Sequence, residues 1–193
     1  MRVKKEETAS VEYLRAHTVG ELQPLSGPIR IVDYDPDWPR QFELQAKKIK
    51  SVLGSVALGI EHVGSTSVPE LPAKPIVDIL VVVANSAHES EYVPALEAAG
   101  FKLRIREPGW HEHRMFQVPE RNVNLHVFST GCTEIERMLV FRDWLRSNAS
   151  DRELYAGTKR ALAQQDWKYI QNYADAKTAV IEEIISHQAI NTI

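Results

Sequence analysis

Two runs of apolar residues separated by a short polar loop form the centre of the predicted fold. From residue 76 to residue 83 every side chain except that of Asp78 is apolar, and most are β-branched. This composition is typical of a strand that is buried on both faces. A shorter apolar stretch at 57–63 precedes it, and the segment between them holds a Gly-Ser-Thr-Ser tetrapeptide and three prolines that stiffen the return. The pattern predicts a strand, a tight loop and a second strand.

The pattern before this centre predicts two helices and one strand. Ser10 is a suitable N-cap for a short helix that ends at residue 17, and a loop follows it. Residues 29–34 read as an edge strand. Apolar side chains then recur at helical spacing over 36–53, and Gly54 ends this helix.

After the centre, the pattern predicts one helix, three strands and a helical C-terminal region. The first helix begins at Asn85 or Ser86 and ends at Gly100, while Ser150 and Glu153 have the spacing of a capping box. This order of elements predicts an α/β fold, in which a mixed sheet is covered by helices. Because no segment resembles an interdomain linker, residues 1–193 are expected to form a single domain. The strands are predicted at 101–105, 115–118 and 123–128, the last two as a hairpin, and the final helices at 133–147, 151–164 and 168–188.

Composition excludes several classes of protein. The 193 residues are 44% hydrophobic and 25% charged, with a net charge of −3, which argues against nucleic acid as the partner. Cys132 is the only cysteine, so the sequence excludes an internal disulfide and a cysteine-rich zinc site. No secretory apolar region and no 18-residue apolar run occurs. We therefore expect a cytoplasmic protein without a membrane partner, and its oligomeric state stays open.

The tetrapeptide Gly64, Ser65, Thr66 and Ser67 is the first candidate for chemistry. Backbone N–H groups and hydroxyls of such a loop can converge on an anion, which would make it a phosphate cradle. The loop lacks the lysine of a Walker A motif and the spacing of a Gly-x-Ser-x-Gly nucleophile elbow. An ordinary turn at the end of a strand explains the same residues.

Asp78 is the second candidate, because a carboxylate in a buried strand is costly unless it is paired, hydrogen-bonded or bound to a metal. One hypothesis is that it holds a divalent ion. The other is a structural role, in which the carboxylate accepts hydrogen bonds from the neighbouring loop. The residues alone leave both hypotheses open.

These motifs resemble the GrpB family, a branch of the nucleotidyltransferase superfamily. Gly64-Ser65 followed after twelve residues by Asp78 resembles the superfamily pattern of Gly-Ser and a later Asp-apolar-Asp. More narrowly, HVGSTSVP at 62–69 and AKPIVDI at 73–79, which contains Lys74, look like GrpB. Similar stretches extend through nearly the whole chain: YDPDWP at 34–39, FRDWLR at 141–146, YADAK at 173–177, and the residues Arg114 and Lys159.

The resemblance implies a nucleotidyltransferase-like fold, a nucleotide or other small phosphorylated ligand, and Asp78 as a catalytic carboxylate on a divalent metal. The chain departs from the superfamily pattern at two places. Leu80 stands where a second carboxylate is expected, and His126 stands where a third is expected. Mg²⁺ prefers oxygen ligands, so a set that contains His126 or His62 would suit a nitrogen-tolerant metal such as Zn²⁺ or Mn²⁺ better. The metal, if one binds, is not decided by the sequence.

Two cations occupy helix positions that usually face the core. Arg142 and Lys177 each fall within an apolar arc of their predicted helices. They either pair with buried acids such as Asp78 or line a polar cleft for an anion. We predict the second arrangement, in which the loop at 64–67 holds a phosphate against basic and aromatic residues. These residues are Lys74, Arg114, Arg142, Lys159, Tyr173 and Lys177.

A non-catalytic function is the rival hypothesis. GrpB-type domains also occur fused to dephospho-coenzyme A kinases, so the resemblance equally implies a ligand-binding or accessory module related to coenzyme A metabolism. The chain has no Walker A motif and is therefore not itself such a kinase. A requirement for a divalent ion separates the enzyme from the binding module.

Overall fold

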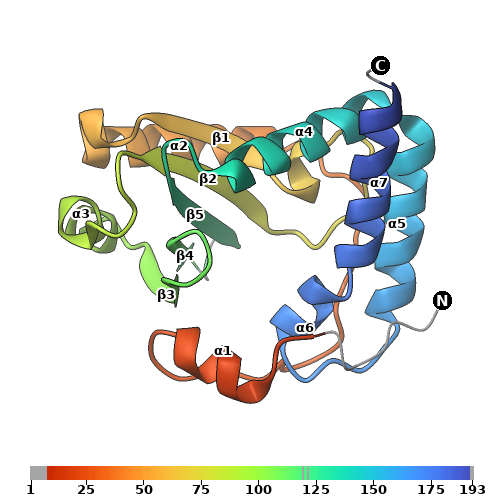
Figure 1. Cartoon of the computed structure of the whole chain (residues 1–193), viewed down its shortest axis with the longest axis horizontal. Helices are drawn as coiled ribbons and strands as arrows, with labels where there is room; N and C mark the ends of the chain where they lie inside the picture. Colours follow the sequence, from red (N-terminus) through yellow and green to blue (C-terminus); the bar gives the residue numbers. More distant parts are fainter. Residues whose placement is uncertain (1–7, 119, 121, 192–193) are drawn as a thin grey trace.

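A mixed β-sheet is the centre of the protein, and the computed structural model describes residues 8–118, 120 and 122–191 (Figure 1). The strands are β1 (Gly59–Val63), β2 (Val77–Val83), β3 (Lys102–Glu107), β4 (His113–Val118) and β5 (Val123–Ser129). The helices are α1 (Val11–His17), α2 (Trp38–Leu53), α3 (Val93–Ala98), α4 (Thr133–Ser147), α5 (Ala149–Ala163), α6 (Ile170–Asp175) and α7 (Thr178–Asn191). The strand order is β1-β2-β5-β4-β3, with β2 and β5 parallel and the other neighbours antiparallel. The predicted α/β fold with a mixed sheet is confirmed.

Side-chain alternation along the strands gives the sheet two different faces. On β2, Ile79 and Val81 belong to the main apolar cluster, together with residues of α2 and α3. Leu80 belongs to a smaller cluster that includes residues of α4. Asp78 has the same parity as Leu80, so it lies on the face whose apolar cover is smaller.

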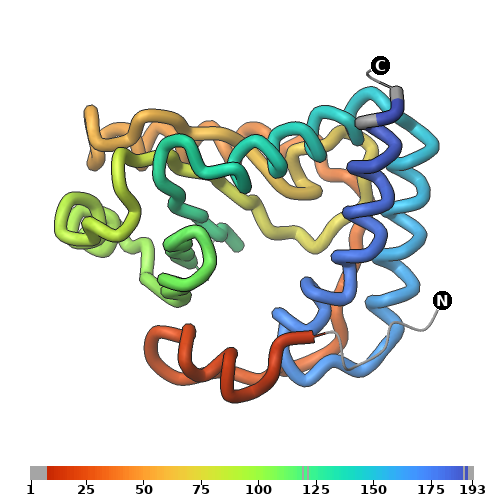
Figure 2. Tube along the Cα trace, in the orientation of Figure 1, coloured from red at the N-terminus to blue at the C-terminus, as the bar shows by residue number. Residues whose placement is uncertain are grey.

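The C-terminal helices pack against one another beside the sheet. Helices α5 and α7 run side by side, and α6 lies close to α1 (Figures 1 and 2). The N–H of Ala9, just before α1, donates to Asp175 of α6 at 2.8 Å, and Asn172 donates to the carbonyl of Ala9 at 3.0 Å. These contacts bring the N-terminal helix to the C-terminal helices across one end of the sheet.

The prediction of one helix over 168–188 was wrong, because the chain breaks between α6 and α7 at Ala176 and Lys177. Tyr173 and Ala176 pack on Leu162, whereas the α7 residues pack in a separate cluster with α4 and α5. The residues of α6 and those of α7 therefore pack into two different apolar clusters, which explains why the predicted helix is interrupted between them. No Gly or Pro marks the break in the sequence.

Three other predicted elements differ in the structure. Only Val32 of the predicted strand at 29–34 pairs, with Ala73, because the neighbouring isoleucines pack on the α5–α6 cluster instead. Asn148, and not Ser150, caps α5 by accepting a hydrogen bond from the N–H of Asp151. The predicted helix after Asn85 begins later, at α3, since Ser86 bonds to the carbonyl of residue 112.

The remaining helices agree with their predictions to within two residues, and the hairpin forms as predicted, although β3 ends at Glu107 rather than at residue 105 and β4 begins at His113 rather than at residue 115. Ser10 caps α1 by accepting from the N–H of Tyr13 at 3.1 Å. β4 and β5 pair as an antiparallel hairpin, whose turn residues 119 and 121 lie outside the described residues. Within the described part of the chain, no helix is both long enough and apolar enough to cross a membrane.

Candidate functional site

A cleft of about 1020 Å³ lies between the partly covered face of the sheet and the C-terminal helices. The sheet contributes polar side chains from β2, β4 and β5, and the loop after β1 contributes Gly64 and Ser65. Helices α5, α6 and α7 close the opposite side, and α1 adds Tyr13 (Figure 1). Of the predicted site residues, the lining contains Gly64, Ser65, Lys74, Asp78, His126, Lys159, Tyr173 and Lys177.

Asp78 faces this cleft, and its carboxylate lies so close to Gly64 that position 64 has no room for a side chain. Gly64 has a φ of +68°, and a Cβ at this position would lie 2.5 Å from Oδ2 of Asp78. Only glycine permits both the positive φ and this close approach. Asn124 lies opposite Asp78 in the β2–β5 register and donates from Nδ2 to Oδ1 at 3.0 Å.

Lysines form the most unusual feature of the cleft. Lys159 is 2% exposed, and its Nζ donates to Oγ of Ser65 at 2.9 Å and to the carbonyl of Pro72 at 2.5 Å. Lys74 and Lys177 place their Nζ atoms 5.5 and 5.2 Å from the ring centre of Tyr173. Within the described residues none of these three lysines forms a salt bridge. Three lysine amines therefore converge in a cleft whose lining also holds the carboxylates of Asp78, Glu107, Glu134, Asp175 and Glu182.

The lysine pKa values reflect this crowding. Burial, together with the charges of Lys177 and Arg160, lowers the pKa of Lys159 to about 6. Burial and Lys177 also lower the pKa of Lys74 to about 8, although Asp78 opposes the shift. Burial lowers the pKa of Lys177 as well, against the opposing charges of Asp78 and Asp175. An anion in the cleft would reverse these shifts, because it favours the charged form of each amine.

Tyr173 supplies a hydroxyl without a partner. Its oxygen is buried, and no hydrogen bond to it is found among the described residues. Burial raises the pKa of this hydroxyl, so it stays a protonated donor. A buried polar atom of this kind is costly unless a ligand or solvent pairs with it. Because Tyr173 lines the cleft, a bound ligand is one such partner.

The other hydroxyls of the predicted phosphate loop form hydrogen bonds with the protein itself. Oγ1 of Thr66 donates to the carbonyl of Ile76 and lies 3.1 Å from Nε2 of His62. Oγ of Ser67 donates to the carbonyl of Gly64. Neither hydroxyl residue lines the cleft, and neither does His62, which stacks on an aromatic ring and whose pKa burial lowers to about 4. The loop therefore presents one hydroxyl to the cleft, that of Ser65.

The structure does not bring the two predicted arginines to the cleft. Arg142 donates to Glu61 at 2.9 Å, to Asp143 and to the carbonyl of His62, which ties α4 to β1. Arg114 is buried and ion-paired with Glu89. Both are placed in structural pairs, outside the residues that line the cleft.

The donor set does not fit the divalent ions that the fold family implies. Asp78 and His126 lie on adjacent strands, with Oδ1 and Nε2 3.7 Å apart. Leu80 lies opposite His126, so the second carboxylate position is apolar. Among the described residues, no group of three or more His, Cys, Asp or Glu could hold a metal ion. Two-ion catalysis needs several carboxylates, and Leu80 and His126 occupy two of the three positions at which the superfamily pattern has one.

Sequence reasoning missed a row of hydrogen-bonded side chains on the floor of the cleft. Nδ1 of His113 lies 2.7 Å from Oε2 of Glu107, and Nε2 of His113 lies 3.0 Å from Nδ1 of His126. The two imidazole rings are stacked at 5.2 Å. His113 could have been placed on the face of His126 by strand alternation, whereas the part of Glu107 depends on the β3–β4 register.

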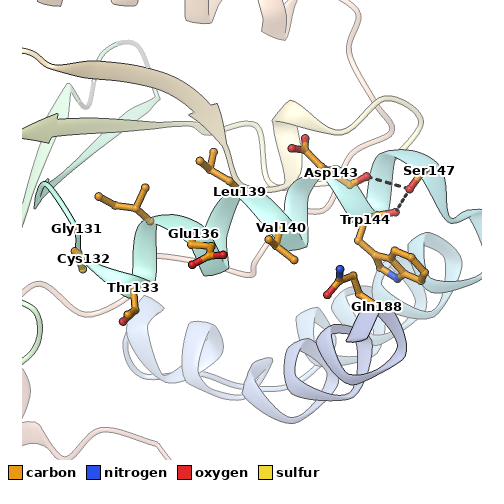
Figure 3. Close-up of a pocket in the computed structure, with 11 residues that line it drawn as sticks. Gly131, Cys132, Thr133, Glu136, Leu139, Val140, Asp143, Trp144, Ser147 and Gln188 are labelled. Carbon is orange, nitrogen blue, oxygen red and sulfur yellow. Dashed lines mark hydrogen bonds between the residues drawn. The ribbon is translucent and has the colours of Figure 1, made fainter. Parts of the chain in front are cut away.

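A second groove, of about 620 Å³, runs along α4 and includes Gln188 of α7 in its lining (Figure 3). Trp144 and Gln188 meet in it, and the Ser147 hydroxyl bonds to carbonyls of its own helix. None of the predicted site residues lines this groove. The candidate chemistry is therefore confined to the cleft.

The fold belongs to the nucleotidyltransferase-like class of folds. The structure of Cid1 in complex with its short product ApU matches with a TM-score of 0.52 and 10% identity, over 76% of this chain and 48% of that one. The GLD-2/RNP-8 complex matches with a TM-score of 0.52 and 12% identity, over 77% of this chain and 60% of that one. At such identities the likeness shows the fold alone.

Within this class the chain belongs to the GrpB family, since the GrpB protein family model matches residues 28–187. A UPF0157 protein of Halalkalibacterium halodurans is 59% identical over 90% of this chain and 89% of its own length. The crystal structure of the conserved protein GrpB from Enterococcus faecalis has 34% identity and a TM-score of 0.74, over 84% of this chain and 99% of that one. A dephospho-CoA kinase of Mycolicibacterium paratuberculosis is 29% identical over 84% of this chain, which spans 46% of that kinase.

Proposed function

We propose that this protein binds a small phosphate-bearing ligand, a nucleotide or a related ester, in the cleft between sheet and C-terminal helices. The observation that carries the proposal is the convergence of Lys74, Lys159 and Lys177 without a salt bridge among the described residues. The carboxylates that line the cleft, Asp78 and Asp175 among them, form no salt bridge with these amines in the described part of the chain. A phosphate group would give the amines a direct anionic partner.

The individual contacts suit a phosphate. Lys159 and Ser65 already lie within hydrogen-bond distance of each other at the rim of the loop, so both can turn toward one oxygen. The Tyr173 hydroxyl, which has no hydrogen-bond partner among the described residues, adds a neutral donor from α6. Charge-assisted hydrogen bonds from amines to phosphate oxygens are about twice as strong as neutral ones. The empty cluster is destabilised by burial and mutual repulsion, and a bound anion relieves both.

Binding is proposed in preference to metal-dependent nucleotidyl transfer. The Gly64-Ser65 and Asp78 pattern favours an enzyme, but Leu80 is apolar, and the described residues contain no group of three or more His, Cys, Asp or Glu that could hold a metal ion. We therefore expect affinity for phosphate ligands to be the same in a chelator as in Mg²⁺, Mn²⁺ or Zn²⁺. Calorimetry with pyrophosphate and ATP in each buffer tests this. A divalent ion that raises affinity at least about tenfold, with the effect lost in Asp78→Asn, would restore the enzyme hypothesis.

A coenzyme A precursor is a specific candidate for the ligand. The similarity to a dephospho-CoA kinase over 84% of this chain favours an accessory role beside that chemistry. Dephospho-coenzyme A and coenzyme A therefore belong in the ligand panel with ATP and UTP. A cytoplasmic location is part of the same proposal.

The experiment compares lysines inside and outside the cleft. Lys74→Met and Lys177→Met are each expected to weaken pyrophosphate binding at least about tenfold, or roughly 1.4 kcal/mol. Lys168→Met is the matched control, because Lys168 is an exposed lysine that also lies over a tyrosine ring but does not line the cleft. Equal affinities in all four proteins would refute the phosphate site.

A further inference from the structure

The two ends of the cleft differ in chemistry. Ser65 and Lys74 lie in the segment between β1 and β2, so the lysine cluster is at the end where β2 begins. Trp110 lies in the loop between β3 and β4, and Phe128 lies near the end of β5. Because β5 runs parallel to β2 and antiparallel to β4, these two aromatic rings meet at the opposite end of the strands. The cleft therefore runs from amines at one end to aromatic rings at the other.

The length of β5 gives the separation of the two ends. Asn124, which donates to Asp78 at 3.0 Å, and Phe128 both line the cleft from this strand. A strand rises about 3.3 Å per residue, so Phe128 lies roughly 13 Å from Asn124 along β5. A ligand that contacts the lysines and also reaches Trp110 must therefore be extended. A nucleoside with a chain of two or three phosphates has this shape.

Trp110 is an exposed aromatic side chain that other rings hold at their edges. It is 40% exposed and lines the cleft. Its ring centre lies 5.3 Å from that of His113 and 5.9 Å from that of Phe128, at interplanar angles of 90° and 70°. The contact with His111 is also edge-on, at 76°. No ring in the described part of the chain is stacked parallel on the indole, and its exposed apolar surface favours contact with a planar ring of a ligand.

Buried polar groups hold the loop that carries Trp110. His111 and Glu112 have φ values of +53° and +49°, a region that is costly for residues other than glycine. The carbonyl of Glu112 accepts hydrogen bonds from Oγ of Ser86 at 2.9 Å and from Nη1 of Arg114 at 2.8 Å. Ser86 and Arg114 are both buried. Strained backbone that is fixed in this way is typical of binding sites, and a platform that is already ordered loses little freedom when a ligand binds.

We propose that Trp110 is the stacking platform for the planar base of a nucleoside di- or triphosphate, whose phosphate chain reaches the lysine end of the cleft. The inference rests on the proposed function, since the lysines hold the phosphates of the same ligand. Stacking on an aromatic side chain tolerates any base, because every base has a flat π face. The platform therefore selects for a planar heterocycle and not for one particular base.

Calorimetry separates the base from the phosphates. ATP is expected to bind wild type about tenfold more tightly than tripolyphosphate. Trp110→Leu should lose this preference and Trp110→Tyr should keep most of it, whereas the affinity for tripolyphosphate should be the same in all three proteins. Equal affinity of wild type for ATP and tripolyphosphate, or an unchanged preference in Trp110→Leu, overturns the inference while the phosphate site stands.

Tryptophan fluorescence locates the base. A base that stacks on the indole is expected to quench its emission, so ATP should quench wild type and quench Trp110→Phe much less. Trp144→Phe is the matched control, because Trp144 lines the second groove and not the cleft, and it should keep the quenching. Quenching of Trp110→Phe as strong as that of wild type overturns the inference. If tripolyphosphate fails to bind wild type while ATP still quenches Trp110, the proposed phosphate site falls and the stacking platform stands.

AMP tests the distance between the two ends. Trp110→Leu and Lys74→Met are each expected to weaken ATP binding about tenfold, because ATP contacts both ends of the cleft. AMP has one phosphate, so its affinity should fall in at most one of the two variants. Equal losses for AMP in both variants would place the base and the phosphate at the same end and overturn the proposed span.

Discussion

Lys159→Met is the sharpest test of how this cleft is built. The substitution keeps the length and apolar stem of the side chain and removes an amine that is 2% exposed. If the lysine is present to bind an anion, its removal should stabilise the folded protein and weaken its ligand binding. Such an exchange of stability for function is common at binding sites.

The lowered pKa of Lys159 determines how much the substitution should stabilise the folded protein. Burial lowers it from 10.5 to about 6, so at pH 7 folding releases a proton that the unfolded chain retains. Each pH unit between 7 and 10.5 corresponds to about 1.4 kcal/mol, which makes the cost of folding at most about 5 kcal/mol. Methionine avoids this cost but leaves the carbonyl of Pro72 without its donor, a loss of about 1–3 kcal/mol. We expect a net stabilisation of at most about 2–4 kcal/mol at pH 7.

The stability that Lys159→Met gains over wild type should change with pH in a direction fixed by the lowered pKa of Lys159. Between about pH 6 and 10.5 the unfolded state binds more protons at this site than the folded state does, so wild-type stability rises with pH. The advantage of Lys159→Met should therefore shrink by up to about 1.4 kcal/mol for each pH unit. Urea unfolding of both proteins at several pH values in this window measures it, with Lys168→Met as the control for an exposed lysine. An advantage that stays constant, or that grows with pH, would refute the reasoning.

Three further results are expected. Gly64→Ala places a Cβ 2.5 Å from Oδ2 of Asp78 and strains a positive φ, so urea unfolding should show a loss of roughly 1–3 kcal/mol, and calorimetry should show a loss of pyrophosphate binding. Arg142→Met breaks the tie between α4 and Glu61, so its melting temperature should fall while its ligand affinity matches wild type; the opposite result would place Arg142 in the binding site. Pyrophosphate binding at pH 7 should take up a proton at Lys159, because the anion raises the lowered pKa of that amine. Its enthalpy should then be less exothermic in Tris than in HEPES, with a smaller difference in Lys159→Met.

Hydrophobic patterning predicted the parts of the fold that depend on local sequence. The apolar run at 76–83 became β2, and the hairpin and α4 lie where their periodicity placed them. The resemblance to GrpB anticipated the nucleotidyltransferase-like architecture. Side chains alternate between the two faces of β2, so Asp78 lies on the same face as Leu80 and away from the main apolar cluster.

The tertiary structure decided which cations are paired. Arg142 and Lys177 both stood at apolar helix positions, and the sequence could not distinguish them. The partner of Arg142 is Glu61, which lies 81 residues away along the chain and is brought close by the packing of α4 on β1. Lys177 lies at the break between α6 and α7, where it faces the cleft.

The row from Glu107 to His126 depended still more on tertiary structure. Periodicity shows which side chains share a face of a strand, but hydrogen bonds across strands require a register. Here a register shift between Leu103 and Ile105 sets Glu107 opposite His113, and the β4–β5 pairing sets His126 beside it. The sequence by itself determined the elements and their buried faces, because burial of apolar surface follows local spacing. The polar contacts of the cleft were decided only when distant strands and helices packed, because a hydrogen bond forms only within a few tenths of an ångström of its ideal length.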